Sequence, residues 1–353
     1  MPSWTNCSGN EPRRDGRPIR DAASASLAAD GGPDLGTLHR RASGRKSAIR
    51  EVAILPRMTP ANAPSTPFSR ILACVAESPH LPAVVREAVR LATLCDAELE
   101  FFHVGETLDA LAPAVREALP PPPNRYADAR LTAQPGGRPD RVILNEAARR
   151  RCDLLFAGAL QEDPMLRGVV GSVARRIARY ADRSVLLSTH PSSPEAFSKT
   201  VVVAVDCSED CGRMMPSLLE FARRASAETV HLVHEYSSYT SRLAGAETEE
   251  TDSGGYGQTQ NAAERLALAS FLDRFDFSSL RVQTACLPGR DGAETIRYAE
   301  QHRADLLAAP GPRRSLGLWD RFFGHPVETL LQRLPCSLLL YRPTPGFAKG
   351  AAG

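Results

Sequence analysis

The chain reads PDRVILNEAARRRCDLLFAG at residues 139–158 and GSVARRIARYADRSVLL at residues 171–187. It repeats this order further on, with DGAETIRYAEQHRADLLAAPG at residues 291–311 and GHPVETLLQRLPCSLLL at residues 324–340. Both copies place a helical pattern before an Asp-Leu-Leu run, and both follow it with a second helix and a second apolar run. A match of this length indicates a duplicated domain, because the unit is too long for a solenoid repeat.

The bulk composition fits two globular domains. The 353 residues are 42% hydrophobic and 24% charged, with a net charge of +2, which is ordinary for soluble protein of this length. No apolar run approaches the ~20 residues that span a bilayer, and the N-terminus has no hydrophobic signal segment. We therefore expect a cytoplasmic protein with no membrane partner and no specific nucleic-acid partner.

The two ends of the chain differ from its middle. Residues 1–67 carry Gly, Pro, Ser, Ala and Arg without apolar periodicity, so we expect a disordered N-terminal extension. A short disordered tail is expected at residues 344–353. The two copies of the domain then occupy residues 68–190 and 198–343, and a short linker containing Pro and Ser joins them.

Short apolar runs alternate with helical patterns through both copies. The runs predict strands at residues 70–76, 97–104, 131–133, 153–157 and 184–188, and again at 200–205, 230–233, 280–285, 306–309 and 337–341. Alternation at this spacing predicts an α/β fold in which each copy is a doubly wound, five-stranded parallel sheet. Ligands bind such sheets outside the carboxyl ends of the strands.

The loop after the fourth predicted strand of the first copy is a candidate anion-binding loop. Gly158 ends the strand, Gly168 and Gly171 follow, and Ser172 opens a helix. A glycine loop that leads into a helix presents unpaired backbone N–H groups to an anion. The alternative is that the glycines only make turns and that Ser172 is the N-cap of its helix.

These features resemble the universal stress protein family. After its fourth strand, that family carries a Gly, two residues, a second Gly, nine residues and a Gly-Ser or Gly-Thr pair. The same spacings hold here, with Gln in place of the middle glycine, at Gly158, Gln161, Gly171 and Ser172. AELEFFHV at residues 97–104 is similar to the family's second strand, and VVVAVDCS at residues 201–208 is similar to its first strand.

The resemblance implies an adenine-nucleotide alpha hydrolase-like fold that binds ATP in many members and no nucleotide in others. In the members that bind ATP, an Asp that closes the first strand contacts adenine, and the glycine loop holds the ribose and phosphates. The first copy has Ala76 at the position of that Asp, whereas the second copy keeps Asp206. Asp206 also suits a turn or a helix N-cap.

The glycine loop of the second copy is altered. One residue is inserted after Asp305, and His325-Pro326 stands where the family has the residues after its last glycine. A proline at the helix start removes an N–H that a phosphate could use. Nearby arginines could bind an anion instead or could be solvated surface charges, namely Arg313, Arg314 and Arg321. By resemblance, the nucleotide contacts of the two copies are Gly158, Gly171, Ser172, Asp206, Gly311, Gly324 and His325.

Two further pairs of residues are candidates for chemistry. His103 and His234 end the second strand of each copy, and we interpret them as structural because neither has a neighbouring nucleophile or carboxylate that would complete a triad. Cys207 and Cys211 lie four residues apart, but no second pair or histidine cluster supports a metal or redox role. The sequence therefore shows no catalytic constellation, and we expect a protein that is not an enzyme.

The leading hypothesis is a cytoplasmic, stress-response regulatory protein of two universal stress protein domains. It would bind ATP or an AMP-type nucleotide, together with Mg²⁺, in one or both copies. The copies are expected to pack as an intramolecular pseudo-dimer through the strands at residues 184–188 and 337–341. The alternative is an interaction module that has lost nucleotide binding in both copies and works through a protein partner.

Overall fold

The computed structural model describes most of the chain between residues 67 and 343. The described ranges are 67–159, 170–189, 199–237, 254–289, 291–311, 326–332 and 334–343. The disorder expected at residues 1–67 and 344–353 concerns segments that, apart from residue 67, lie outside these ranges. The predicted contacts Gly324 and His325 also lie outside them, as do Gln161 and the three loop arginines.

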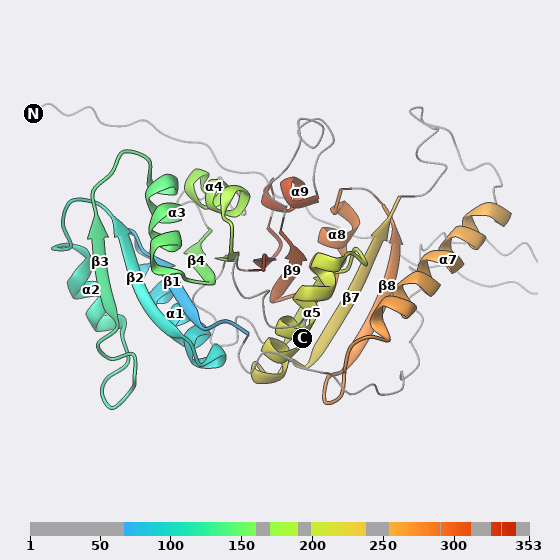
Figure 1. Ribbon diagram of the computed structural model, residues 1–353, viewed down its shortest axis with the longest axis horizontal. Helices are drawn as coiled ribbons and strands as arrows, with labels where there is room; N and C mark the ends of the chain where they lie inside the picture. Colours follow the sequence, from blue (N-terminus) through green and yellow to red (C-terminus); the bar gives the residue numbers. More distant parts are fainter. Residues whose placement is uncertain are drawn as a thin grey trace, which may run out of the picture. The chain divides into compact units, whose positions relative to one another are not determined.

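The first copy alternates strands and helices as predicted (Figure 1, blue to green). Its elements are β1 (Arg70–Cys74), α1 (Leu81–Cys95), β2 (Glu98–Val104), α2 (Leu111–Ala118), β3 (Arg130–Gln134), α3 (Pro139–Arg150), β4 (Leu154–Gly158), α4 (Ser172–Tyr180) and β5 (Ser184–Ser188). Prolines occupy the first turns of α1 and α3, where the missing N–H costs no helical hydrogen bond.

The second copy repeats this order (Figure 1, yellow to red). Its elements are β6 (Thr200–Ala204), α5 (Glu209–Arg224), β7 (Thr229–Tyr236), α7 (Gly254–Leu272), β8 (Val282–Pro288), α8 (Ala293–Gln301), β9 (Leu306–Pro310), α9 (Pro326–Gln332) and β10 (Ser337–Tyr341). β8 starts and ends later than the strand predicted at residues 280–285, because its ladder with β7 continues as far as the pair of Tyr236 and Pro288.

The strands of both copies form one ten-stranded sheet with the order β3-β2-β1-β4-β5-β10-β9-β6-β7-β8. Within each copy, neighbouring strands are parallel, which confirms the doubly wound architecture. The copies meet where β5 and β10 pair antiparallel, with Leu186 opposite Leu339. The predicted pairing of residues 184–188 with residues 337–341 is therefore present, and it covers the apolar edge strand of each copy.

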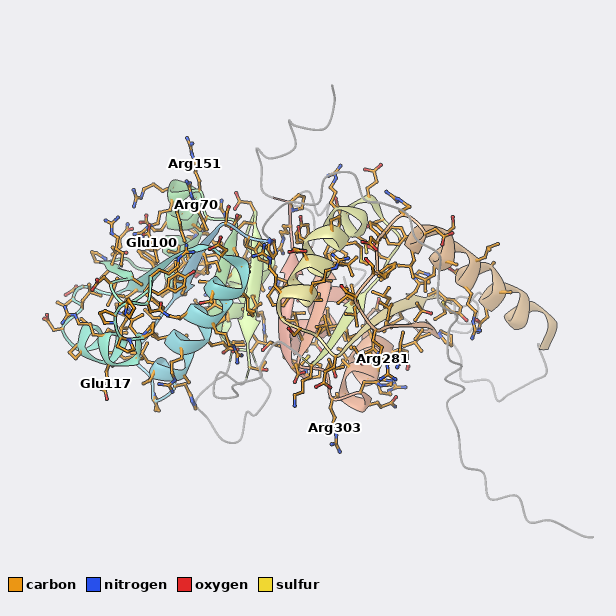
Figure 2. All side chains as sticks on the ribbon, turned by 90° about the horizontal axis from the view of Figure 1, so that it is seen from below. Arg70, Glu100, Glu117, Arg151, Arg281 and Arg303 are labelled. Carbon is orange, nitrogen blue, oxygen red and sulfur yellow. The ribbon has the colours of Figure 1, made fainter. Side chains whose placement is uncertain are left out.

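Two apolar layers cover the faces of this sheet. Buried residues of α1, α2, α5 and α7 pack on one face, and buried residues of α3, α4, α8 and α9 pack on the other. Because both faces are covered, the central strands read as continuous apolar runs instead of alternating ones. Exposed charged side chains such as Glu117, Arg151 and Arg303 project outward from the ribbon (Figure 2).

The repeated Asp-Leu-Leu run has the same structural role in both copies. The carboxylate of Asp153 accepts hydrogen bonds from the backbone N–H groups of Ser69 (2.8 Å) and Arg70 (3.0 Å) at the start of β1. Asp305 accepts the corresponding bonds from Lys199 (3.1 Å) and Thr200 (2.8 Å). Each aspartate therefore satisfies the donors at the start of the neighbouring strand, which explains why the duplication retains it.

Buried side chains of the second copy reach across the boundary between the copies. Arg342 is 6% exposed, and its Nη2 donates to the carbonyl oxygen of Ala178 in α4 at 2.6 Å. The backbone N–H of Arg342 donates to Ser184 Oγ at 3.1 Å. Arg179 of α4 forms an ion pair with Glu328 of α9. No helix within the described ranges is both long and apolar enough to cross a membrane.

Candidate functional site

The first copy contains a cavity at the carboxyl ends of its central strands. Its volume is about 370 Å³, within the range of small-molecule sites. The strands β1, β2, β4 and β5 and the helices α1, α3 and α4 contribute to its wall, at the edge of the sheet where a doubly wound fold binds ligands. The predicted contact Gly158 is one of the lining residues.

The wall of this cavity is largely apolar. Its apolar side chains include Val84 of α1, Phe102 of β2, Ile143 of α3 and Ile177 of α4. Ala76 lies in the wall at the position where the family carries an aspartate. Its polar side chains are few, and the described lining residues include no lysine or arginine. The cavity is therefore suited to an uncharged, flat or apolar group.

The start of α4 lies against the cavity, although its two predicted contact residues do not line it. Gly171 is the N-cap of α4, and its N–H donates to the carbonyl oxygen of Ala159 at 3.1 Å. Ser172 is the first helical residue and is exposed, so the alternative interpretation of Ser172 as the N-cap is wrong. Val173 and Ala174, in the first turn, do line the cavity.

His103 holds the end of β2 to the residue that follows β1. Its Nδ1 lies 3.0 Å from the carbonyl oxygen of Val75, and a carbonyl only accepts, so Nδ1 carries the hydrogen. In the tautomer with this hydrogen on Nδ1, Nε2 is an acceptor, and the ring lines the cavity. Gly105 leaves room for the ring, because a Cβ there would lie 2.2 Å from Nε2.

Glu87 lies behind the cavity wall and was not found from the sequence. It is 3% exposed, and its carboxyl is hydrogen-bonded to the hydroxyl of Ser188, which lines the cavity. Its other oxygen, Oε1, is buried and has no hydrogen-bond partner in the described part of the chain. Burial raises the pKa of Glu87 to about 7, while Ser188 and Arg90 oppose this shift.

The sequence did hold a signal for Glu87. It follows Val84 by three residues and precedes Leu91 by four, so the helical spacing places it on the buried face of α1. A single carboxylate on an otherwise apolar helix face is costly unless it has a partner. The pairing with Ser188 joins residues 101 positions apart, which the spacing alone does not indicate.

Asp206 in the second copy takes part in a turn. It is exposed, and its Oδ1 accepts a hydrogen bond from the N–H of Ser208 at 2.9 Å. The Oγ of Ser208 then caps α5 by accepting from the N–H of Cys211 at 3.1 Å. This is the turn role that the sequence left open for Asp206, and the adenine contact implied by resemblance stays a prediction.

The second copy fills the position that the first copy leaves open at Ser188. Tyr341 pairs with the last residue of β9 as Ser188 pairs with the last residue of β4. Its phenol is partly buried against the apolar layer of α5 and is hydrogen-bonded to Ser217, which occupies the place of Glu87. In the first copy the larger side chain of the pair, Glu87, comes from the helix. In the second copy the larger side chain, Tyr341, comes from the strand.

The start of α8 in the second copy is capped by a side chain from β7. Glu235 follows His234 directly, where the first copy has Val104 after His103. Its carboxylate accepts hydrogen bonds from the backbone N–H groups of Gly292 (3.1 Å) and Thr295 (2.9 Å) at the start of α8. A side-chain carboxylate therefore takes the donors at the start of α8, the helix that corresponds to α3 of the first copy.

The register of β9 corrects the alignment of the predicted glycine contacts. β4 and β9 both have five residues, and Pro310 pairs with Tyr341 as Gly158 pairs with Ser188. The residue inserted after Asp305 therefore does not lie within the strand. The counterpart of Gly158 is Pro310, and Gly311 lies one position beyond it.

Gly311 is covered by the side chain of a buried arginine. A Cβ on this residue would lie 2.7 Å from the Cγ and Nε atoms of Arg342. The glycine therefore makes room for the arginine that crosses to the first copy. The space beside Gly311 is filled by protein, which does not favour its predicted role as a nucleotide contact.

The remaining candidate residues of the second copy are His234, Cys207 and Cys211. His234 Nδ1 lies 2.7 Å from the carbonyl oxygen of Val205, which repeats the contact of His103, and its Nε2 lies 3.1 Å from Glu264 Oε2 in α7. Burial raises the pKa of Cys207 to about 11 and that of Cys211 to about 12, so both stay protonated thiols. In the part of the chain that the structure describes, no cluster of His, Cys, Asp or Glu could hold a metal ion.

Comparison with known proteins agrees with this architecture. The model of the family described as "Universal stress protein family" matches residues 67–188 and again residues 198–342. The chain belongs to the universal stress protein family. The two matches follow the two halves of the sheet, and the predicted family is therefore confirmed. No curated protein sequence matches the chain significantly.

Several solved structures share the fold over most of the chain. A functionally unknown protein, PA1789, from Pseudomonas aeruginosa PAO1 is 17% identical, with a TM-score of 0.60, over 78% of this chain and 93% of that one. A putative universal stress protein from Pseudomonas aeruginosa UCBPP-PA14 is 17% identical, with a TM-score of 0.58, over 78% and 94%. A universal stress protein from Archaeoglobus fulgidus DSM 4304 is 13% identical, with a TM-score of 0.53, over 77% and 98%. At these identities the likeness concerns the fold alone.

Proposed function

We propose that this chain is a cytoplasmic regulatory protein of the stress response that binds an adenine nucleotide of the ATP or AMP type in its first domain. The observation that carries the proposal is the cavity of about 370 Å³ at the carboxyl ends of β1, β2 and β4. In the described part of the second domain, Tyr341 packs on the apolar layer at the counterpart of Ser188, and Arg342 covers Gly311. The two domains have therefore diverged into one that binds a ligand and one that supports it.

The features of the cavity favour a purine nucleotide. Its apolar side chains suit the faces of a purine ring, whose burial is favourable by roughly 25 cal/mol per Å² of apolar surface. The first turn of α4 borders the cavity, and a helix N-terminus favours a phosphate at its rim. Mg²⁺ would then arrive with the phosphates.

We propose that the protein acts by binding and not by turnover. His103, one of the two histidines that line the cavity, uses its Nδ1 to hold the carbonyl of Val75, so its ring already has a structural role. Such a protein would signal through the change in stability or surface that its ligand causes, since a ligand stabilises the state to which it binds.

A second candidate function is a pure interaction module. Ala76 in the first domain removes the carboxylate that contacts adenine in the family, and the second domain fills its own site. If neither domain binds nucleotide, the sheet and its helices would serve as a scaffold for a protein partner.

Calorimetric titration of the full chain, stripped of nucleotide, distinguishes these candidates. Titrants would be Mg-ATP and AMP, with buffer alone as the blank. We expect one site per chain with micromolar affinity and a matching rise in melting temperature. The absence of heat and of any thermal shift at millimolar ligand would overturn nucleotide binding and leave the interaction module, while two equivalent sites would contradict the asymmetry of the domains.

A further inference from the structure

We propose that the first-domain cavity recognises the nucleoside part of its ligand through two hydrogen-bond acceptors, His103 Nε2 and Ser188 Oγ, and that the phosphates add little to the affinity. This inference rests on the proposed function and deepens it, because it names the part of the ligand that is bound and the residues that select it. It differs from recognition by an aspartate and a phosphate loop.

The charge of the cavity wall does not favour buried phosphates. The described lining of the cavity contains no lysine or arginine, and the two arginines in the first turns of α4 are engaged elsewhere. Arg175 Nη2 donates to the carbonyl oxygen of Val170, and Arg176 lies 3.7 Å from Asp140. Glu77 lies in the wall and adds a negative charge. Because burying an unpaired charge is costly, the phosphates should remain at the rim, in solvent.

His103 offers a hydrogen-bond acceptor to the cavity. Nδ1 of His103 is committed as a donor to Val75, so the neutral ring offers only the lone pair of Nε2. No described residue supplies a hydrogen bond to Nε2. In the second domain the same nitrogen of His234 is taken by Glu264. The free acceptor is therefore a property of the first domain alone.

Ser188 offers the second acceptor. When Glu87 is ionised, it can only accept, so the hydroxyl of Ser188 must donate to it. The hydrogen of Ser188 is then used, and only lone pairs remain on its oxygen; Ser188 is a lining residue of the cavity and is buried from bulk solvent. Glu87 is thus a positioning residue that acts through Ser188. His103 Nε2 and Ser188 Oγ would together select a ligand that carries donors, such as the exocyclic amino group of adenine.

The test compares adenosine, inosine, AMP and ATP by calorimetry on the full chain. Adenosine should bind within about threefold of ATP, and it should bind about tenfold more tightly than inosine. Inosine has a carbonyl in place of the amino group, and a lost hydrogen bond of about 1.4 kcal/mol corresponds to that factor. Raising the salt concentration should leave the affinity for AMP nearly unchanged, since exposed charges contribute little.

Three variants test the residues. His103→Asn keeps a donor at the position of Nδ1 and removes Nε2, and Ser188→Ala removes the hydroxyl. Each should reduce the preference for adenosine over inosine. Glu87→Gln lets the amide donate to Ser188, so the hydroxyl is free to donate and the preference should fall while the protein stays folded. His234→Asn is the matched control in the second domain and should leave every affinity as in the parent.

The outcomes separate this inference from the proposed function. Tight binding of ATP without binding of adenosine would overturn the inference and leave nucleotide binding intact. Equal affinities of His103→Asn and the parent, with an unchanged preference for adenosine, would also overturn it. If no adenine compound binds, both the proposed function and the inference are wrong.

Discussion

At the scale of the residue, the duplication works as an internal comparison. His103 and His234 make the same contact with the carbonyl that follows the first strand of their domain, so that role belongs to the fold. Glu87 and Ser217 occupy the same helical position but have opposite partners, a serine in one domain and a tyrosine in the other. The difference between the domains therefore lies in a few buried side chains.

Glu87 makes the stability of the protein depend on pH. Burial raises its pKa from 4.5 to about 7, so the folded state binds a proton that the unfolded state has released. The stabilisation by the protonated form is fully present below pH 4.5 and is lost as the pH rises through 7. Relative to the parent, Glu87→Gln should gain roughly 2–4 kcal/mol of unfolding free energy between pH 4.5 and pH 8.

Denaturant unfolding at both pH values measures this effect. Glu117→Gln is the control for the loss of a carboxylate, because Glu117 is exposed on α2. A constant difference between Glu87→Gln and the parent at both pH values would show that Glu87 is not a buried titrating group.

At the scale of the element, the sequence was sufficient for most strands and helices. The apolar runs placed β5 and β10 at their observed bounds. β7 is longer than predicted and β8 is shifted, because element ends depend on tertiary contacts. The sequence indicated the residue inserted after Asp305, and the pairing of Pro310 with Tyr341 shows that the insertion follows the strand.

The contacts that distinguish the two sites could not be predicted in the same way. The bond between Glu87 and Ser188, and the covering of Gly311 by Arg342, join residues far apart in the chain. The resemblance to the family indicated where a ligand should bind, but not which copy keeps the space for it. That depends on the volume of single side chains, such as Ser188 and Tyr341, at equivalent positions.

Asp153 should support the start of β1 as strongly as Asp305 supports the start of β6. Asp153→Ala and Asp305→Ala each remove an acceptor of two backbone N–H groups, so each should cost roughly 1–3 kcal/mol of unfolding free energy. Asp128→Ala, in an exposed turn, is the control and should cost less than about 0.5 kcal/mol. Unfolding in denaturant measures all three, and a loss confined to one aspartate would contradict the shared role.

At the scale of the whole molecule, one sheet passes through both domains, and buried groups couple them. Arg342→Met keeps the stem over Gly311 but removes the donor to Ala178, so it should cost roughly 1–3 kcal/mol and should separate the unfolding of the two domains in calorimetric scans. Arg179→Met removes an ion pair that is one-third exposed and should cost less than about 1 kcal/mol. Equal effects of the two variants would contradict the importance of the buried contact.

The central claim is that the first domain binds the ligand while the second domain fills its own site. Its most direct test is calorimetric titration with AMP of two variants. The double variant Glu87→Ser, Ser188→Tyr copies the second-domain pair of Ser217 and Tyr341 into the first domain. The second variant is Asp206→Ala. We predict that the double variant remains folded and loses at least 30-fold in affinity, roughly 2 kcal/mol, whereas Asp206→Ala binds like the parent. Retained binding by the double variant and lost binding by Asp206→Ala would contradict the account and place the ligand in the second domain.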